Sequence, residues 1–266
     1  MGQKENINSI STFNLFKIFI FIILFFAFGV IVTFSVLSII SPLKKIEEIN
    51  NKYTDENIDI KFREALFNND LFRLKKEEAF IKARLLMSEN DSINLSIDIP
   101  DSLIAIEIKG TNIYSIHIKK VQICNVLNHI DRSALINYLG SPFCILQEKA
   151  TILKEPLIIK KAPKDSIEAN RNNVQQDTLD PKTVVYHFYT DKDLMINIKQ
   201  SEDLDIINSF KFQFDYNRQI SNIQLKKLIR FKIPDYIPWI NLEVDKKEAI
   251  AIYRALPEHA FISIHF

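Results

Sequence analysis

The chain has 266 residues, with 34 lysines and arginines against 33 aspartates and glutamates, and a formal net charge of +1. This balance excludes the basic character typical of nucleic-acid-binding proteins, and only four glycines are present to build a phosphate-binding loop. Once a tail and an anchor are set aside, roughly 220 residues remain, enough for one large or two small domains with a hydrophobic core.

The first predicted element is the uncharged apolar run Ile18–Ile40. About 20 apolar residues in a helix span a bilayer, and this run exceeds the usual signal-peptide core and lacks a small-residue cleavage site behind it. We therefore expect a short polar tail at residues 1–17 and an uncleaved transmembrane anchor at 18–40 that contacts membrane lipid. Pro42 is expected to end this helix or to kink it at the membrane interface.

The charges beside the anchor and the overall layout point to opposite orientations. Lys44, Lys45, Lys52 and Lys61 follow the apolar run, which slightly favours a cytoplasmic C-terminal side. Long domains cross membranes regardless of such charges, and one early anchor before a large domain is a common envelope arrangement. We expect a single-pass protein of the cytoplasmic membrane with its C-terminal domain in the periplasm.

Residues 41–89 have mostly helical periodicity and are predicted to form a helical stalk or a helix that packs on the following domain. Asp70 is expected to be the N-cap of a second helix in this segment. A coiled-coil dimer is the alternative, although the heptad register does not hold over three repeats. The apolar positions at helical spacing are Phe62, Ala65, Leu66, Phe72, Ala79, Phe80, Ala83, Leu86 and Met87.

Residues 90–161 change to a period of two and form the first strand-rich half. Alternating isoleucines predict three short strands, with turns at Pro100–Ser102 and Gly110–Asn112, arranged as an antiparallel meander. Residues 131–140 resemble a short helix that ends at a glycine. Residues 151–160 can form a further strand, which Pro156 would confine to a sheet edge or a bulge.

The polar stretch 162–183 is predicted to be a surface loop or linker, because it contains little to bury. Residues 184–266 form the second half. Alternation predicts strands at 184–188, 194–198, 210–216, 240–244 and 262–266, and helical spacing appears at 218–231. Asp245 is expected to cap a last helix with Glu248 in a capping box. The class is α+β, mostly antiparallel with a few packed helices, and the two halves form either two sheets of one domain or two small domains.

No side chain is assigned to a catalytic, cofactor-binding or metal site. Cys124 and Cys144 are interpreted as buried thiols, with one disulfide bridge or a Cys–His pair as alternatives. Asp98 and Asp101 are explained by turn chemistry, and Trp239 as a core or edge aromatic, with a ligand platform as the alternative. The histidines have no metal-ligand spacing. His117, His187 and His265 are expected on solvated strand faces. The other two histidines, His129 and His259, lie outside the strand patterns.

Two resemblances bear on function. Residues 101–110, Asp-Ser-Leu-Ile-Ala-Ile-Glu-Ile-Lys-Gly, resemble the opening hairpin of the L,D-transpeptidase catalytic domain. That family's histidine and Ser-x-Gly-Cys-type segment have no counterpart here, so its catalysis is not carried over. Short segments around 82–86, 154–156, 161–165 and 251–257 resemble uncharacterised single-pass envelope proteins of the Bacteroidota, which implies an envelope-facing domain and no known activity.

These observations predict a membrane-anchored, non-enzymatic scaffold or interaction protein of the cell envelope, with a protein partner and without a nucleic-acid partner or a cofactor. A thiol-dependent envelope enzyme related to peptidoglycan remodelling is the alternative.

Overall fold

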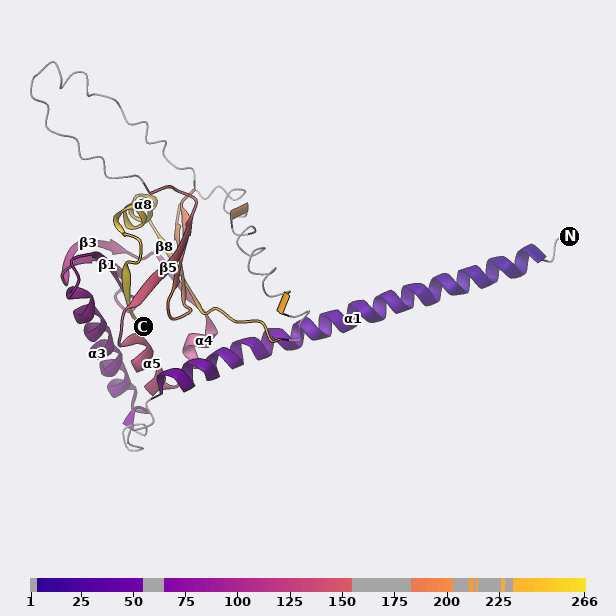
Figure 1. The fold of residues 1–266 in the computed structure, drawn as a ribbon, viewed down its shortest axis with the longest axis horizontal. Helices are drawn as coiled ribbons and strands as arrows, with labels where there is room; N and C mark the ends of the chain where they lie inside the picture. The colour runs from indigo at the N-terminus through magenta and orange to yellow at the C-terminus, as the bar shows by residue number, and fades with distance from the viewer. Residues whose placement is uncertain are drawn as a thin grey trace, which may run out of the picture. The chain divides into compact units, whose positions relative to one another are not determined.

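A computed structural model describes residues 4–54, 65–154, 183–202, 211–212, 214, 226–227 and 232–266 (Figure 1). The chain divides into two compact units, which are described separately. One unit combines residues 1–45 with 222–236, and the other combines residues 46–221 with 237–266. The described residues are mixed α+β, with a large mixed sheet and an N-terminal apolar helix.

The N-terminal helix α1 spans Lys4–Tyr53 and contains Pro42. An end at Pro42, one of the two outcomes expected there, is therefore wrong. Proline removes one backbone hydrogen bond, but the turns before and after it keep theirs, so a long helix can continue. Just before Pro42, the Ser41 hydroxyl donates to the carbonyl oxygen of Pro234 at 2.7 Å, within the same unit.

The last turns of α1 belong to the second unit, where they pack on helix α5 (Arg132–Leu139). Ile49 is buried, and the Asn50 side chain accepts a hydrogen bond from the backbone of Asp131 at 3.0 Å. The rings of Tyr53 and Tyr138 meet edge to face, with centroids 5.0 Å apart. These contacts give α5 a fixed neighbour on one side.

Helix α3 spans Asn69–Ser88 and packs on the domain through Ala79, Phe80, Ala83 and Met87. Its N-cap is Asn68, whose side chain accepts hydrogen bonds from the backbone of the next turn. The prediction of Asp70 as the cap is wrong by two positions; this residue instead lies in the first turn, where a carboxylate also suits the helix dipole.

The predicted meander is confirmed. Strands β1 (Ile93–Asp98), β2 (Leu103–Ile108) and β3 (Thr111–His117) are antiparallel neighbours. The turn between β2 and β3 lies one residue earlier than expected, at Lys109 and Gly110, whose φ angles are 51° and 73°. Both values suit a two-residue hairpin whose twist matches the strands.

The remaining elements complete a sheet of order β3-β2-β1-β9-β5-β6-β7-β8-β4. Strand β9 lies parallel to β1 and antiparallel to β5, and β7 lies parallel to β8. The described strands of both halves therefore belong to one mixed sheet. The bounds are β4 Lys120–Ile123, α4 Asn125–Asn128, β5 Phe143–Ala150, β6 Val185–Thr190, β7 Met195–Gln200, β8 Trp239–Val244, α8 Lys246–Ala255 and β9 Phe261–His265.

Several predicted elements differ from the structure. Strand β5 precedes the predicted strand at 151–160, and that segment from 155, with 162–182, lies outside the described residues. The strand at 210–216 is wrong at its described positions, because Lys211, Phe212 and Phe214 are helical. Of the helix at 218–231, only Lys226 and Lys227 are described, and both are helical. A short alternating run thus did not decide between strand and helix.

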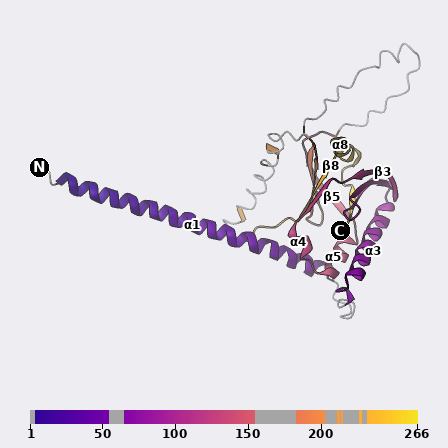
Figure 2. The ribbon, with the colours of Figure 1, turned by 180° about the vertical axis from the view of Figure 1, so that it is seen from behind.

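Helix α8 begins after Asp245, as predicted, but the capping box is absent. The Asp245 side chain makes no cap hydrogen bond and instead pairs with Lys119. The helix packs on the sheet, where it contacts β7 (Figure 2). From β6, the Tyr186 hydroxyl donates to the carbonyl oxygen of Ala249 at 2.9 Å. The rings of Tyr186 and Tyr253 meet at a 39° tilt with centroids 5.0 Å apart, and both residues are buried, so this aromatic contact is part of the core.

Candidate functional site

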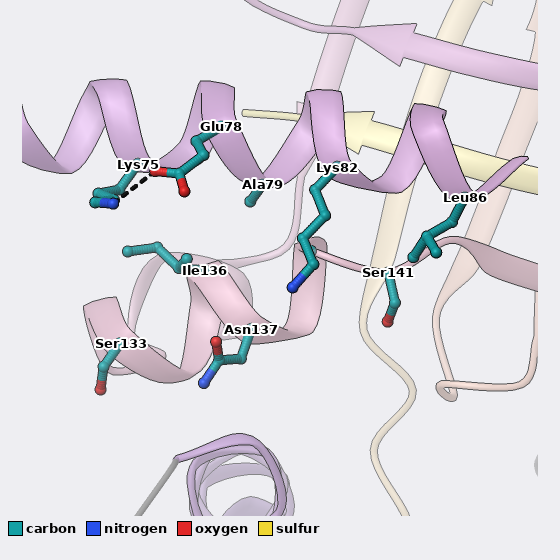
Figure 3. Close-up of a pocket in the computed structure, with 10 residues that line it drawn as sticks. Lys75, Glu78, Ala79, Lys82, Leu86, Ser133, Ile136, Asn137 and Ser141 are labelled. Carbon is teal, nitrogen blue, oxygen red and sulfur yellow. Dashed lines mark hydrogen bonds and ion pairs between the residues drawn. The ribbon is translucent and has the colours of Figure 1, made fainter. Parts of the chain in front are cut away.

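A groove of about 410 Å³ lies between α3 and α5 (Figure 3). The two helices approach each other closely at Gly140, where an added Cβ would lie 3.9 Å from the Cβ of Ala79. Small residues at this point set the base of the groove, and longer polar side chains form its walls. The lining residues are Lys75, Glu78, Ala79, Lys82, Leu86, Ser133, Ile136, Asn137, Gly140 and Ser141.

Lys82 contributes a positive charge to the α3–α5 groove. Its side chain extends from α3 across the groove, on the side that faces Asn137 and Ser141 (Figure 3). Among the described residues it has no ion-pair partner, whereas the ammonium of Lys75 lies 2.6 Å from the Glu78 carboxylate. The Lys75–Glu78 pair is exposed and adds little stability, because water screens both charges.

A buried lysine contacts Ser141, one of the residues that line the groove. The ammonium of Lys192 lies 2.6 Å from the carbonyl oxygens of Tyr138 and Ser141, and 2.8 Å from the Ser141 hydroxyl. Burial lowers the pKa of Lys192 to about 8; the Lys52 charge acts in the same direction, and Asp191 opposes it. A cation at the C-terminus of α5 also suits the helix dipole, so Lys192 orders the residues that end this helix.

Lys76 and Arg132 contribute to a second hollow of about 300 Å³. Lys76 donates to the carbonyl oxygen of Phe266 at 2.6 Å, and Arg132 donates to the Leu66 carbonyl oxygen and stacks over Phe72. Burial, and then the Arg132 charge, lower the pKa of Lys76. Both cations are engaged with their own chain, so this hollow is a weaker candidate than the groove.

A row of polar side chains crosses the other half of the sheet. His187 on β6 contacts Asn197 on β7 at 2.5 Å, Asn197 donates to Asn241 on β8 at 2.6 Å, and Asn241 reaches Gln122 on β4 at 3.5 Å. The four residues are direct cross-strand partners. Each side chain is bonded to the next, so the row is a structural network; Phe212 stacks on His187.

The prediction that the three strand histidines lie on solvated faces is only partly correct. His117 is exposed, but His187 is 3% exposed, and burial lowers its pKa to about 4. Its hydrogen bond to Asn197 replaces the water that a surface position would provide. His265 is half-buried, stacks on Phe80 and lies 3.0 Å from Asp98.

Neither cysteine is arranged as a nucleophile. Both are free thiols in the structure, and Cys144 is only half-buried, not buried as expected. The Cys144 sulfur contacts the carbonyl oxygens of Ile145 and His259, and burial followed by the Asp191 charge raises the pKa of Cys144. Cys124 is buried and accepts a hydrogen bond from the Trp239 backbone. Trp239 itself is a half-buried residue at the start of β8.

Sequence reasoning singled out none of the residues that line the α3–α5 groove for chemistry. Asp98 and Asp101 form their predicted turn contact, at 3.3 Å, away from the groove. The groove is built by contacts between segments distant in sequence, which a single sequence does not reveal. Its cations, hydroxyls and amide suit the binding of a polar or negatively charged group. Its described lining holds no histidine or cysteine for acid–base or thiol chemistry.

These observations define a mixed α+β protein with one described helix that is long and apolar enough to cross a membrane, at Lys17–Tyr53. A signal sequence near the N-terminus would meet the same criterion. No family model, curated protein or solved structure significantly matches the chain. No family or activity is therefore carried over from a relative.

Proposed function

We propose that the protein is a membrane-anchored, non-enzymatic scaffold or interaction protein of the cell envelope. In this proposal α1 crosses the cytoplasmic membrane once, and the α+β domain lies in the periplasm, where it binds a protein partner. The carrying observation is the apolar surface of α1, most of whose large side chains between Ile18 and Ile40 are exposed in the structure. A folded soluble protein normally buries such a surface, and lipid is the environment that suits it.

The polar groups of this segment support the same proposal. Thr33 donates to the carbonyl oxygen of Gly29 at 2.8 Å, and Ser35 donates to that of Ile31 at 2.9 Å. Both hydroxyls are thus satisfied within the helix, as the interior of a bilayer requires. The groove between α3 and α5 supports the interaction role, because it offers Lys82, which has no ion-pair partner among the described residues, beside hydroxyl and amide groups.

Insertion is tested with two double variants of the full chain. Phe25→Lys/Phe28→Lys places two charges in the apolar run, where each costs about 2.5–3.5 kcal/mol in a bilayer centre. Phe67→Lys/Leu153→Lys changes two apolar residues outside it that are even more exposed. We expect the wild-type chain and the second variant to remain with membranes in alkaline carbonate, and the first to be extracted. Extraction of all three would contradict anchoring.

Cleavage and orientation are tested on the same material. The mass of the cell-derived chain distinguishes an anchor, which retains residues 18–40, from a signal sequence, which loses them. In spheroplasts we expect added protease to digest the domain while a cytoplasmic control protein survives. Protection that disappears only on lysis would place the domain in the cytoplasm and overturn the envelope proposal.

A further inference from the structure

Helix α3 has apolar side chains on two opposite faces. Ala79, Phe80, Ala83 and Met87 face the sheet and are buried. Leu74, Ile81 and Leu85, spaced by seven and four residues, follow one stripe on the other side, where they are 53%, 56% and 66% exposed. Helical residues at these spacings share a face, so the stripe is continuous. The described structure contains nothing that covers it.

The outward stripe matches a heptad pattern written abcdefg. Positions a are Leu71, Glu78 and Leu85, and positions d are Leu74, Ile81 and Ser88. The buried residues occupy positions b, c and f, opposite this seam. The sequence pattern alone mixes the two faces, which is why no sustained register is evident in it. Once the inner face is assigned to the core, the outer seam can be recognised as that of a short coiled coil.

We infer that this stripe binds the same stripe of a second copy of the chain, as a parallel, in-register pair of α3 helices. The charges beside the seam are the reason for choosing a second copy as the partner. In a parallel pair each g residue lies near the e residue five positions later on the other helix. All three such pairs join opposite charges: Asp70 with Lys75, Glu77 with Lys82, and Arg84 with Glu89 of the second copy.

The antiparallel arrangement is less complementary. With its apolar layers aligned, Leu74 would lie beside Leu85 of the second copy, but Lys75 would lie beside Lys82, and this repulsion would occur twice. In the parallel pair the central contact, Glu77 with Lys82, joins two exposed residues with no ion-pair partner among the described residues. Arg84 is already held 2.7 Å from Glu107, so it contributes less.

The seam also explains why the pairing is weak and selective. Glu78 occupies the central a position, where it faces Glu78 of the second copy. A polar residue at this position weakens a coiled coil and restricts its register. The inference rests on the proposed function in one respect, because anchoring in one membrane raises the effective concentration of the second copy. Lys75 and Lys82 also line the α3–α5 groove, so the second helix would border its open side.

The test is oxidative crosslinking of the full chain in membranes. Leu74→Cys alone should form a disulfide-linked dimer, because identical d positions meet in a parallel pair. Ile113→Cys is the matched control, since Ile113 is 58% exposed on edge strand β3 and Leu74 is 53% exposed on α3. The wild-type chain measures the background from its own cysteines. Crosslinking of Leu74→Cys no greater than that of Ile113→Cys overturns the inference.

Two further variants test the charges and the orientation. In the Leu74→Cys background, Glu77→Lys should reduce dimer yield about tenfold, and the added Lys82→Glu should restore it, since the pair is reversed but kept. A dimer that forms only when Leu74→Cys and Leu85→Cys chains are mixed would show an antiparallel pair and overturn the parallel one. A crosslinked product containing another protein would overturn the choice of a second copy.

Failure of the inference is distinguishable from failure of the proposed function. Carbonate extraction reports on membrane anchoring without reference to α3. In detergent, Glu78→Leu should shift the full chain from its 31.0 kDa mass toward twice that mass, because it replaces the facing carboxylates by leucines. A monomeric Glu78→Leu chain in detergent, with a carbonate-resistant wild-type chain, would reject the pairing and leave the anchor standing.

Discussion

The ammonium group of Lys192, in the turn between β6 and β7, lies 2.6 Å from the carbonyl oxygen of Tyr138 in the last turn of α5. The contact joins two segments more than fifty residues apart. The same ammonium lies 4.1 Å from the ring centroid of Phe143, so its aliphatic stem and its charge are both enclosed. One buried side chain therefore holds the end of a helix against the sheet.

Replacing this lysine should weaken the fold. Lys192→Met keeps the length of the side chain but leaves the oxygens of Tyr138 and Ser141 without their donor, so the free energy of unfolding should fall by about 1–3 kcal/mol. Denaturant unfolding monitored by circular dichroism measures the change. Lys199→Met, at a half-exposed lysine that pairs with Glu243, is the control and should change stability by less than about 1 kcal/mol. Equal losses of unfolding free energy in the two variants would show that the buried contact contributes no more stability than the half-exposed ion pair.

His187 should make the protein sensitive to acid. Its pKa of about 4 in the folded state lies below the ordinary value of 6.5. Between these values the unfolded chain binds a proton that the folded protein does not, so the free energy of unfolding falls as pH drops from 6.5 to 4. The full shift corresponds to about 3 kcal/mol.

Two variants isolate this contribution. His187→Phe should flatten the pH dependence between pH 6.5 and 4, whereas His117→Phe, at an exposed strand position, should retain the wild-type slope. The quantity compared is the difference in unfolding free energy between the two pH values. An unchanged slope in the His187 variant would assign the acid sensitivity to other groups.

Substitutions at the two central residues of the β2–β3 turn should have different effects on the stability of the protein. Gly110 has a φ of 73°, and an added Cβ would lie 3.1 Å from the Cβ of Ser88. Gly110→Ala should therefore lower the unfolding free energy by about 1 kcal/mol or more. Lys109→Asn should be neutral or slightly stabilising, because asparagine tolerates the positive φ of this position. Thermal unfolding of both variants measures the contrast, and a destabilised Lys109→Asn would contradict the turn geometry.

The buried hydroxyls of Ser96 and Ser263 should act as a pair. They lie 2.9 Å apart on neighbouring strands β1 and β9, and both residues are buried. Ser263→Ala should cost about 1–2 kcal/mol, because it leaves the Ser96 hydroxyl without a partner. The double variant Ser96→Ala/Ser263→Ala should cost less than the sum of the two single variants. Chemical denaturation of the four proteins in this cycle measures the coupling, and strict additivity would show none.

Local patterns predicted the meander, α5, α8 and strands β6 to β8, since alternation and helical spacing in these segments agree with their final packing. The pattern failed where burial depends on distant residues. Phe212 belongs to an alternating run yet is helical, and His187 alternates with Tyr186 and Phe188, on the face predicted to be solvated, yet is buried. Both positions are decided by which surface packs on them, and a single sequence does not contain that information directly.

The candidate site was less accessible to prediction than the fold. Lys82 and Ser141 stand in segments with no motif, and only the packing of α3 on α5 brings them to one groove. The coiled-coil alternative for α3 was visible as a hypothesis, but its register could be defined only after the inner face was known. Membrane insertion, orientation and partner stay predictions, to be tested as proposed above.

The place of β9 between β1 and β5 has a consequence for biosynthesis. All the other described strands of the sheet are translated before β9, yet β9 is the strand that joins β1 on one side to β5 on the other. During translation the strands that will flank it leave the ribosome with their pairing edges open. Such open edges favour aggregation, so the nascent chain should depend on chaperones until Phe261–His265 emerges and the sheet can close.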